Sequence, residues 1–463
     1  MMTAARLAQW GLGLEAAQVP PPARAAAVRH LLDGAGAAVG AARRWGDHPA
    51  VQVAADLAGP EQATILGRSP RVSAPAAALA NGTLLHAMDF DDTHAGGLVH
   101  ATAVVLPAVL AVGEEVDATG EEALVAALAG FEVACRLAAA APHAFHARGL
   151  HATAAVGVFS SAMVASRLLG LDEPTTVNAL GIAGSQAGGL LEFLATGAST
   201  KQLHPGFAGH AGILAARLAH AGATGPESVI EGRHGLFAAL LDHTVDTARI
   251  TDGLGERWEV ERITLKPYPA CQLVHVSLDA ARSALQRAGR SRLERTEVES
   301  VRVRVHPDCV DIVCEPREDK VAPRTSYDAK FSLPWSLAAL LMDGEIELAT
   351  YAEDSIARAE VAEFAGRVVI EVQPSEGVAA DAPGHVEIRL ADGRRLLGEV
   401  SRSAGGPDQP LTDDEVDRKF LANCEEAPGA PDLIRSIRQL TDEPSVRALA
   451  SALSAVATRE EDR

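Results

Sequence analysis

Residues 81–107 read NGTLLHAMDFDDTHAGGLVHATAVVLP, and the rest of the chain is organised around this stretch. Histidines and aspartates stand here among small and apolar residues: His86, Asp89, Asp91, Asp92, His94 and His100. A solvated acidic face would carry Lys or Arg for charge balance, and this stretch contains neither. Burial and mutual charge shift the pKa values of carboxylates and imidazoles in such surroundings towards catalytic use.

Three interpretations of this stretch compete. In the plainest, residues 80–90 are helical and Asp91, Asp92 and Thr93 cap the next helix. In the second, the histidines and aspartates hold a divalent metal ion, but their spacing matches no standard signature such as HExxH. In the third, the stretch is a loop that positions a substrate and moves protons. The remainder of the chain favours the third interpretation, and no metal is expected.

Composition restricts the class of protein. The 463 residues suit two domains, and 48% are hydrophobic although only 4% are aromatic, so Ala and Leu must build helical cores. A net charge of −20 argues against binding to nucleic acid or an anionic membrane. Five scattered cysteines without a CxxC pair, no signal peptide and no apolar run long enough to span a membrane indicate a cytoplasmic protein.

The chain changes character near residue 263. Before it, apolar residues recur at helical spacing in 2–13, 23–44, 48–58, 101–115, 120–141, 151–169, 173–188, 207–221 and 233–242. After it, residues 298–306 and 366–373 alternate, and 385–401 form a hairpin with its turn at Asp392–Gly393. Helices are expected between these strands at 275–289, 331–343 and 349–364, and a capping box begins another helix at Thr412. We therefore expect a small α+β domain with an antiparallel sheet that ends near residue 407.

Further basic and imidazole residues lie in short segments rich in Gly or Pro. His151 precedes an Ala-rich helix, and Lys201 and His204 precede the helix expected at 207–221. A helix N-terminus there would favour an anion, although an ordinary loop lysine is the commoner explanation. Cys271 and His275 are four residues apart, but no third group that would orient a nucleophilic pair is apparent.

Five segments in order resemble the motifs of the MmgE/PrpD family: NGTLLHAMDFDDTH, LHATAAVGVFSSA, STKQLHPGFAGHAGILAARLAHAGATGP, KPYPACQLVH and DAKFSLPWSLAALL. The resemblance covers residues 5–425. It implies a mostly α fold, in which residues 1–263 and 408–463 form a large all-helical domain and residues 264–407 an inserted α+β lid. It also implies an active site between the two domains, a homodimer and no organic cofactor.

The resemblance also implies roles for particular residues. It places Asp89, His100, His151 and Lys201 in catalysis. It places Thr93 and Lys266 in binding a small anionic carboxylate, and we expect Cys271, His275 and Lys330, which lie in the fourth and fifth segments, to bind it as well. One departure is that Cys271 stands where the decarboxylases of the family have a histidine. Another is that HAGGLVHATA replaces the WGHPSDN-like run of the methylcitrate dehydratases. Five small residues are expected to leave room for a larger acid: Gly96, Gly97, Ala101, Gly188 and Gly189.

The expected reaction begins with removal of an α-proton from a di- or tricarboxylate. A dehydratase similar to 2-methylcitrate dehydratase is preferred, and an epimerase of an imino- or aminodicarboxylate is the alternative. A decarboxylase similar to cis-aconitate decarboxylase comes third because of Cys271. In a different class, the chain would be an inactive helical scaffold, which would not exchange the α-protons of such acids with solvent.

Overall fold

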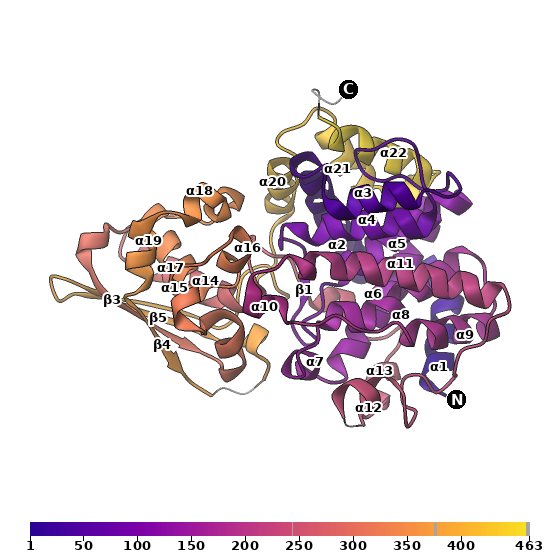
Figure 1. Ribbon diagram of the computed structural model, residues 1–463, viewed down its shortest axis with the longest axis horizontal. Coiled ribbons are helices and arrows are strands. Elements are labelled where there is room, and N and C mark those ends of the chain that lie inside the picture. The colour runs from indigo at the N-terminus through magenta and orange to yellow at the C-terminus, as the bar shows by residue number, and fades with distance from the viewer. Residues whose placement is uncertain (243, 375–376, 460–463) are drawn as a thin grey trace.

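The structure is a computed structural model that describes residues 1–242, 244–374 and 377–459. Its larger part is a body of stacked helices, and a smaller part with a sheet stands to one side (Figure 1). The mostly helical fold expected from the sequence is confirmed. Among the described residues, no helix is both long and apolar enough to cross a bilayer.

The helical body combines N-terminal and C-terminal segments of the chain. Its longer N-terminal helices are α1 (Thr3–Gly13), α2 (Pro21–Arg44), α3 (Pro49–Leu57), α4 (Ala74–Ala87), α5 (Ala101–Val116), α6 (Gly120–Ala139), α8 (Ala152–Leu168), α9 (Glu173–Gly184) and α11 (Thr200–His220). The short ones are α7 (Ala144–Ala147), α10 (Phe193–Thr196), α12 (Leu236–Leu241) and α13 (Ala248–Thr251). The C-terminal helices α20 (Asp413–Asn423), α21 (Ala430–Arg438) and α22 (Val446–Ala457) return to the body and share its hydrophobic core.

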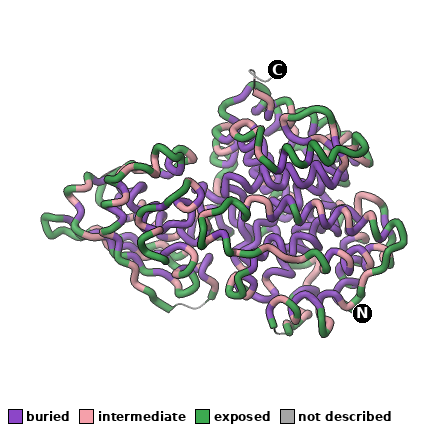
Figure 2. Tube along the Cα trace, viewed as in Figure 1, coloured by how far each residue is buried: buried purple, intermediate pink, exposed green. Residues whose placement is uncertain are grey.

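Helix α4 is the centre of this body. Every residue of α4 is buried, and the helix packs against α2, α5 and α11 (Figure 2). A side chain at Gly82 would approach the Gly206 backbone to 3.0 Å, so two glycines allow α4 and α11 to lie close together. The Ala-rich and Gly-rich composition thus permits tight packing between helices, and it places the end of α4 deep inside the molecule.

The smaller part is built on a four-stranded sheet in the order β4–β3–β5–β6. The strands are β3 (Val298–Val305), β4 (Val368–Val372), β5 (Gly384–Leu390) and β6 (Arg395–Val400). Helix α14 (Gln272–Arg287) packs on β5 and β6, and α17 (Leu333–Asp343) packs on α14 and α19 (Ala359–Ala365). These elements share a second hydrophobic core. The domain boundaries at residues 263/264 and 407/408 stay a prediction.

Three local expectations were wrong. The sheet is mixed, because β4 pairs in parallel with β3, and the helices between these strands form the crossover that a parallel pair requires. Residues 349–364 form α18 (Glu353–Ile356) and α19 with a 3-10 turn before them, in place of one helix. Helix α11 begins at Thr200, so Lys201 lies in its first turn and Pro205 lies inside the helix.

A short two-stranded pairing connects residues 81–107 with the segment near residue 263, where the sequence pattern of the chain changes. Strand β1 (Thr93–His94) pairs antiparallel with β2 (Ile263–Thr264). Lys266 lies two residues after β2, so this pairing brings it back beside the loop that begins at Met88. Residues distant in the sequence thereby meet at the end of α4.

Candidate active site

Asp89 lies just after α4 and joins two lysines from distant parts of the chain. Its Oδ1 accepts hydrogen bonds from Lys201 Nζ at 2.8 Å and from Lys266 Nζ at 3.0 Å. Lys266 Nζ also donates to the Asp89 carbonyl oxygen at 3.0 Å. All three side chains are buried. One carboxylate therefore faces two buried ammonium groups, and this cluster suits an anionic ligand.

The charges of this cluster determine its ionisation. Burial alone would raise the pKa of Asp89, but Lys201 and Lys266 outweigh it and hold the pKa well below the ordinary value. Burial alone would lower the pKa of Lys266, but Asp89 and Asp91, with a smaller contribution from Cys271, together outweigh it and raise that pKa. The Asp89 backbone has a φ of 51°, a left-handed conformation that is unfavourable for a residue with a Cβ. Such strain concentrates at functional sites.

His86 and His100 share a second buried carboxylate. His86 Nδ1 lies 2.8 Å from Asp91 Oδ2, and His100 Nδ1 lies 3.6 Å from the same oxygen. His100 Nδ1 is also 2.9 Å from the Asp92 carbonyl oxygen and 3.2 Å from Thr93 Oγ1. These acceptors assign the proton of each neutral ring to Nδ1, which leaves Nε2 as the basic atom. His86 Nε2 is buried without a hydrogen-bond partner among the described residues.

His151, the residue before α8, completes a group of three imidazoles. Its ring centroid lies 5.6 Å from that of His100 and 5.7 Å from that of His86. Its Nδ1 lies 3.0 Å from His204 Nδ1, so His204 on α11 orients the ring. Burial, followed by the charge of Lys201, lowers the pKa values of His86, His100 and His151 well below the ordinary value. The three rings are therefore neutral at physiological pH.

The same imidazoles have a spacing that a metal ion could use. His86, His100 and His151 bring ligand atoms within 4.8 Å of one another. The charges of Lys201 and Lys266 make added positive charge on His86 and His100 unfavourable, and a divalent cation would meet the same repulsion. The two lysines therefore oppose a cation at the three imidazoles, whereas Asp89 and Asp91, which with His86 and His100 form a second group of possible ligands, would attract one.

A cavity of about 40 Å³ opens onto part of this cluster. Its polar lining residues are Thr93, His100, His146, His151, Lys201, Cys271 and Gln272. Apolar side chains, among them Phe193 and Phe331, form much of the wall. This volume is well below the ~300–1,000 Å³ of typical ligand pockets, so we expect the cavity walls to move apart when a polycarboxylate binds.

The expectation that five small residues leave room for a larger acid was wrong, because none of Gly96, Gly97, Ala101, Gly188 and Gly189 lines the cavity. A Cβ at Gly97 would lie 2.3 Å from Ala138, and one at Gly96 would lie 3.1 Å from the His94 ring. These glycines therefore allow the loop to pack closely against its neighbours.

Three predicted binding residues lie in different places. Cys271 lines the cavity, and burial raises its pKa, so it is a neutral thiol. Lys330 Nζ donates to the carbonyls of Met88 at 2.6 Å and Pro269 at 2.8 Å, and burial lowers its pKa to about 7. His275 Nε2 lies 3.1 Å from the Ala270 carbonyl oxygen, and its side chain does not line the cavity. Cys271 and His275 share no hydrogen bond among the described residues.

Other residues join the site without having been assigned a role. Asp91 and His86 both belong to residues 81–107. The chain turns between them after the end of α4, so that Asp91 Oδ2 lies 2.8 Å from His86 Nδ1. Tyr327 packs against Phe193 and Phe331, and its buried hydroxyl has no hydrogen-bond partner among the described residues. Its only signal in the sequence is its place in SYDAKFSLPW.

Buried neutral histidines predict a pH-dependent stability. Burial, followed by the charge of Lys266, lowers the pKa of His275 to about 3, whereas an unfolded chain has ~6.5. Between these values the unfolded state binds the extra proton, so this histidine's contribution to stability falls as pH falls, by about 1.4 kcal/mol per pH unit. We expect His275→Gln to remove that slope from the free energy of unfolding, measured with denaturant between pH 6 and pH 4. Identical slopes for variant and parent would contradict the assignment.

Fold and site together describe a mostly helical protein with a buried cluster of lysines, aspartates and histidines. Family comparison identifies the MmgE/PrpD N-terminal domain over residues 5–247 and the MmgE/PrpD C-terminal domain over residues 268–443. The chain therefore belongs to the MmgE/PrpD family.

Curated relatives match most of the chain. Cis-aconitate decarboxylase of Aspergillus terreus is 27% identical over 472 residues, which cover 95% of this chain and 94% of the relative. Cis-aconitate decarboxylase of Homo sapiens is 30% identical over 356 residues, covering 75% of this chain and 72% of the relative. The enzyme of that name from Mus musculus is 29% identical over 371 residues, covering 78% and 74%.

Proposed function

We propose that this protein is a lyase that acts on a small tricarboxylate through a carbanion next to a carboxylate group. The observation that carries this proposal is the Asp89 cluster, in which two buried lysines share one carboxylate beside neutral imidazoles. The two ammonium groups suit the substrate's carboxylates and the charge that develops on the reacting carbon. The relatives named as cis-aconitate decarboxylases support a tricarboxylate substrate.

Within this class we propose dehydration as the reaction. His100 or His151, both of which line the cavity, takes the α-proton. Because the surroundings lower the pKa of each imidazole, the imidazolium formed in this step is a strong acid. It is therefore suited to protonate the departing hydroxyl group. Lys201 binds a substrate carboxylate as a point charge, and Thr93 donates a hydrogen bond to the substrate.

Asp89 and Lys266 act from behind the cavity wall. Neither residue lines the cavity, but Asp89 Oδ1 holds Lys201 Nζ at 2.8 Å, and Lys266 holds both the carboxylate and the backbone of Asp89. We propose that this pair orients Lys201, so that the ammonium group needs little reorganisation when the substrate binds.

Decarboxylation is the second candidate because two observations favour it. The curated relatives carry that activity in their names. The wall formed by Phe193, Phe331 and neighbouring apolar residues would favour conversion of a charged carboxylate into neutral CO₂. Cys271, which stands where the decarboxylases of the family have a histidine, counts against it because a neutral thiol cannot replace an imidazole in proton transfer at pH 7.

Proton NMR in deuterated water on a panel of polycarboxylates tests these reactions. A hydroxytricarboxylate that loses its hydroxyl and gains a vinyl signal would establish dehydration. Loss of CO₂ from cis-aconitate would establish decarboxylation, and exchange of an α-proton without a new product would establish an epimerase. A protein that neither exchanges nor converts any acid of the panel would contradict the proposal and favour an inactive scaffold.

We also propose that the protein is a homodimer, with an interface on α3 and α11. Phe207 and Leu218 are about half exposed and lie 11 residues apart on α11, which places them about three turns apart on one face. Val53 and Leu57 on α3 are each 53% exposed, and both helices pack on α4. We propose that these four exposed apolar side chains together form the interface.

Light scattering after gel filtration measures this association. We expect twice the 48.1 kDa of one chain, and a monomer when Phe207 and Leu218 are both replaced by Asp, because two buried carboxylates would oppose the contact. Val369→Asp, at an exposed apolar position on β4, is the matched control and should leave the dimer intact. A parent protein with the mass of one chain would contradict the proposal.

A further inference from the structure

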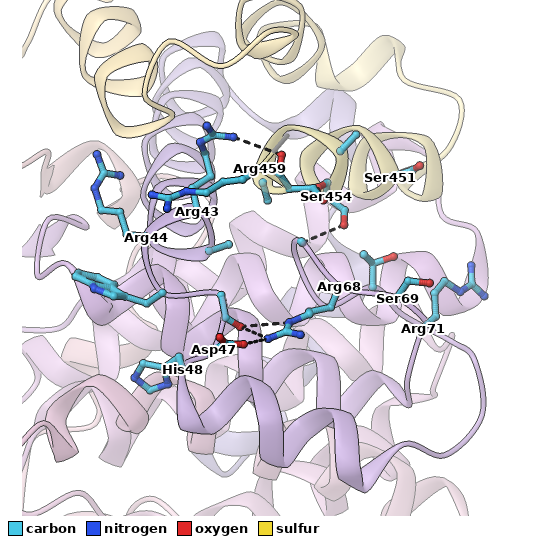
Figure 3. Close-up of a pocket in the computed structure, with 18 of the residues that line it drawn as sticks. Arg43, Arg44, Asp47, His48, Arg68, Ser69, Arg71, Ser451, Ser454 and Arg459 are labelled. Atoms are coloured by element: carbon cyan, nitrogen blue, oxygen red, sulfur yellow. Dashed lines mark hydrogen bonds and ion pairs between the residues drawn. The ribbon is translucent and has the colours of Figure 1, made fainter. Parts of the chain in front are cut away.

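A groove of about 1300 Å³ lies on the helical body, between the C-terminal end of α2, the loop at 64–71 and α22 (Figure 3). Its lining is basic, although the chain has a net charge of −20. Six arginines line it: Arg43, Arg44, Arg68, Arg71, Arg447 and Arg459. Only Asp47 and Glu114 among its lining residues carry carboxylates. This groove is separate from the cavity at His100 and His151, with which it shares no lining residue.

Three of these arginines converge on one carboxylate. Glu425 lies 3.3 Å from Arg43 Nε, 3.6 Å from Arg44 Nη2 and 3.5 Å from Arg459 Nη2. One negative charge therefore faces three positive charges. Burial lowers the pKa of Arg44, and although Glu425 opposes this, the charges of Arg459 and Arg43 add to the lowering. The excess charge at this end of the groove would be relieved by an anion.

These guanidinium groups are held in place by the backbone. Arg43 Nη1 donates to the Val456 carbonyl at 2.9 Å, and Arg44 Nη1 donates to the Asn423 carbonyl at 2.7 Å. Both carbonyls lie at the ends of helices, where arginine commonly caps, so capping explains why two of these arginines are ordered. The partial negative charge of each helix end offsets only part of the positive charge of Arg43 or Arg44. Arg459 adds a further positive charge beside them.

The opposite wall contributes Arg68 and Arg71. Arg68 pairs with Asp47, as Figure 3 shows. Arg71 donates to the Glu61 carbonyl, and among the described residues no carboxylate lies within ion-pair distance of it. Ser454 Oγ accepts a hydrogen bond from Gly67 N at 3.0 Å and so joins this loop to α22. Positive charge thus faces the groove from both walls.

Trp45 adds a different kind of surface. It follows Arg44 directly, lines the groove and is 42% exposed. A planar indole face exposed beside a row of guanidinium groups suits a ligand that carries an aromatic ring next to several negative charges. The groove volume is ample for a ligand of that size.

We propose that this groove binds a nucleoside polyphosphate, with the phosphates on the arginines of both walls and the base stacked on Trp45. The proposal is independent of the lyase reaction, because it uses none of the residues assigned to that site. The groove begins at His48 and Pro49, next to the α3 face proposed for the dimer. Binding is therefore measured on the intact protein in its solution assembly.

Isothermal titration of the intact protein with ATP, inorganic triphosphate and adenosine provides the test. We expect saturable binding of ATP and of triphosphate that weakens as salt rises, and weak or no binding of adenosine. Arg71→Gln and Arg459→Gln should each weaken ATP binding about tenfold, as expected from losing one charge-assisted contact. Arg302→Gln, an exposed arginine on β3, is the matched control and should bind ATP normally.

Trp45→Ala separates the two parts of the ligand. It should weaken binding of ATP about tenfold, since base stacking contributes ~1–3 kcal/mol, and leave binding of triphosphate unchanged. Melting temperatures close to the parent's would show that the variants are folded. The proposal is overturned if the parent binds neither ATP nor triphosphate, or if groove variants bind both as the parent does. It is also overturned if Trp45→Ala leaves the preference for ATP over triphosphate intact.

Discussion

Asp89→Asn should abolish turnover and destabilise the fold. The amide keeps the size of the carboxylate but removes the one charge that, among the described residues, faces Lys201 and Lys266 at hydrogen-bond distance. Breaking a buried ion pair by removing one partner costs on the order of 3–5 kcal/mol, because the remaining charge is uncompensated. We expect a loss of this size in the free energy of unfolding, measured with denaturant at pH 7.

The pH dependence of this loss has a definite sign. Because the folded pKa of Asp89 lies well below 3.8, its stabilising effect is present above about pH 4 and is lost as pH falls through the folded value. Parent and Asp89→Asn should therefore converge in stability only in strong acid. Lys266 has a raised pKa, so its contribution persists through neutral pH and disappears at strongly basic pH.

A surface carboxylate provides the control for Asp89. Asp47 is largely exposed and pairs with Arg68, so Asp47→Asn should cost less than about 1 kcal/mol. Equal stability for Asp89→Asn and the parent at pH 7 would contradict the ion-pair account. Full turnover by a folded Asp89→Asn protein would contradict its proposed role in holding Lys201.

Replacing His151 or His100 by Gln should reduce turnover by about 10²–10⁴-fold, the usual contribution of a positioned acid or base. Each glutamine can retain some polar contacts of the ring but cannot take up a proton from carbon. Both imidazoles line the cavity, and His151 Nε2 is buried without a hydrogen-bond partner among the described residues. The measurement is the rate of α-proton exchange and of product formation with the best substrate of the polycarboxylate panel.

His220→Gln is the matched control for these two variants. His220 is exposed at the end of α11, the helix that carries His204, and it should keep the parent's rate. Unfolding measurements distinguish chemical from structural loss, since a catalytic role predicts near-normal stability. If folded His100→Gln and His151→Gln both retain the parent's turnover, neither imidazole is the base, and the proton carrier must be sought at His86 or Tyr327.

Much of the fold followed from local patterns. The helical repeats, the alternating strands at 298–306 and 366–373, and the Asp392–Gly393 turn all appear in the structure close to their expected bounds. Such features depend on neighbouring residues. The parallel pairing of β4 with β3 was missed because strand direction is decided by the connection between two strands, which lie over 60 residues apart here. Likewise, Pro205 concealed the true start of α11 at Thr200.

For the site, the sequence by itself determined which residue types were present and that the stretch at 81–107 lacked a balancing cation. Its resemblance to the MmgE/PrpD family singled out Asp89, Lys201 and Lys266 as members of one site. Only the tertiary structure decided how they meet: both lysines on one carboxylate oxygen, His86 and His100 on Asp91, and His275 away from the cavity. The physical reason is that ionisation in a buried cluster depends on the distance and solvation of every neighbouring charge, and chain folding sets these over separations of more than 100 residues.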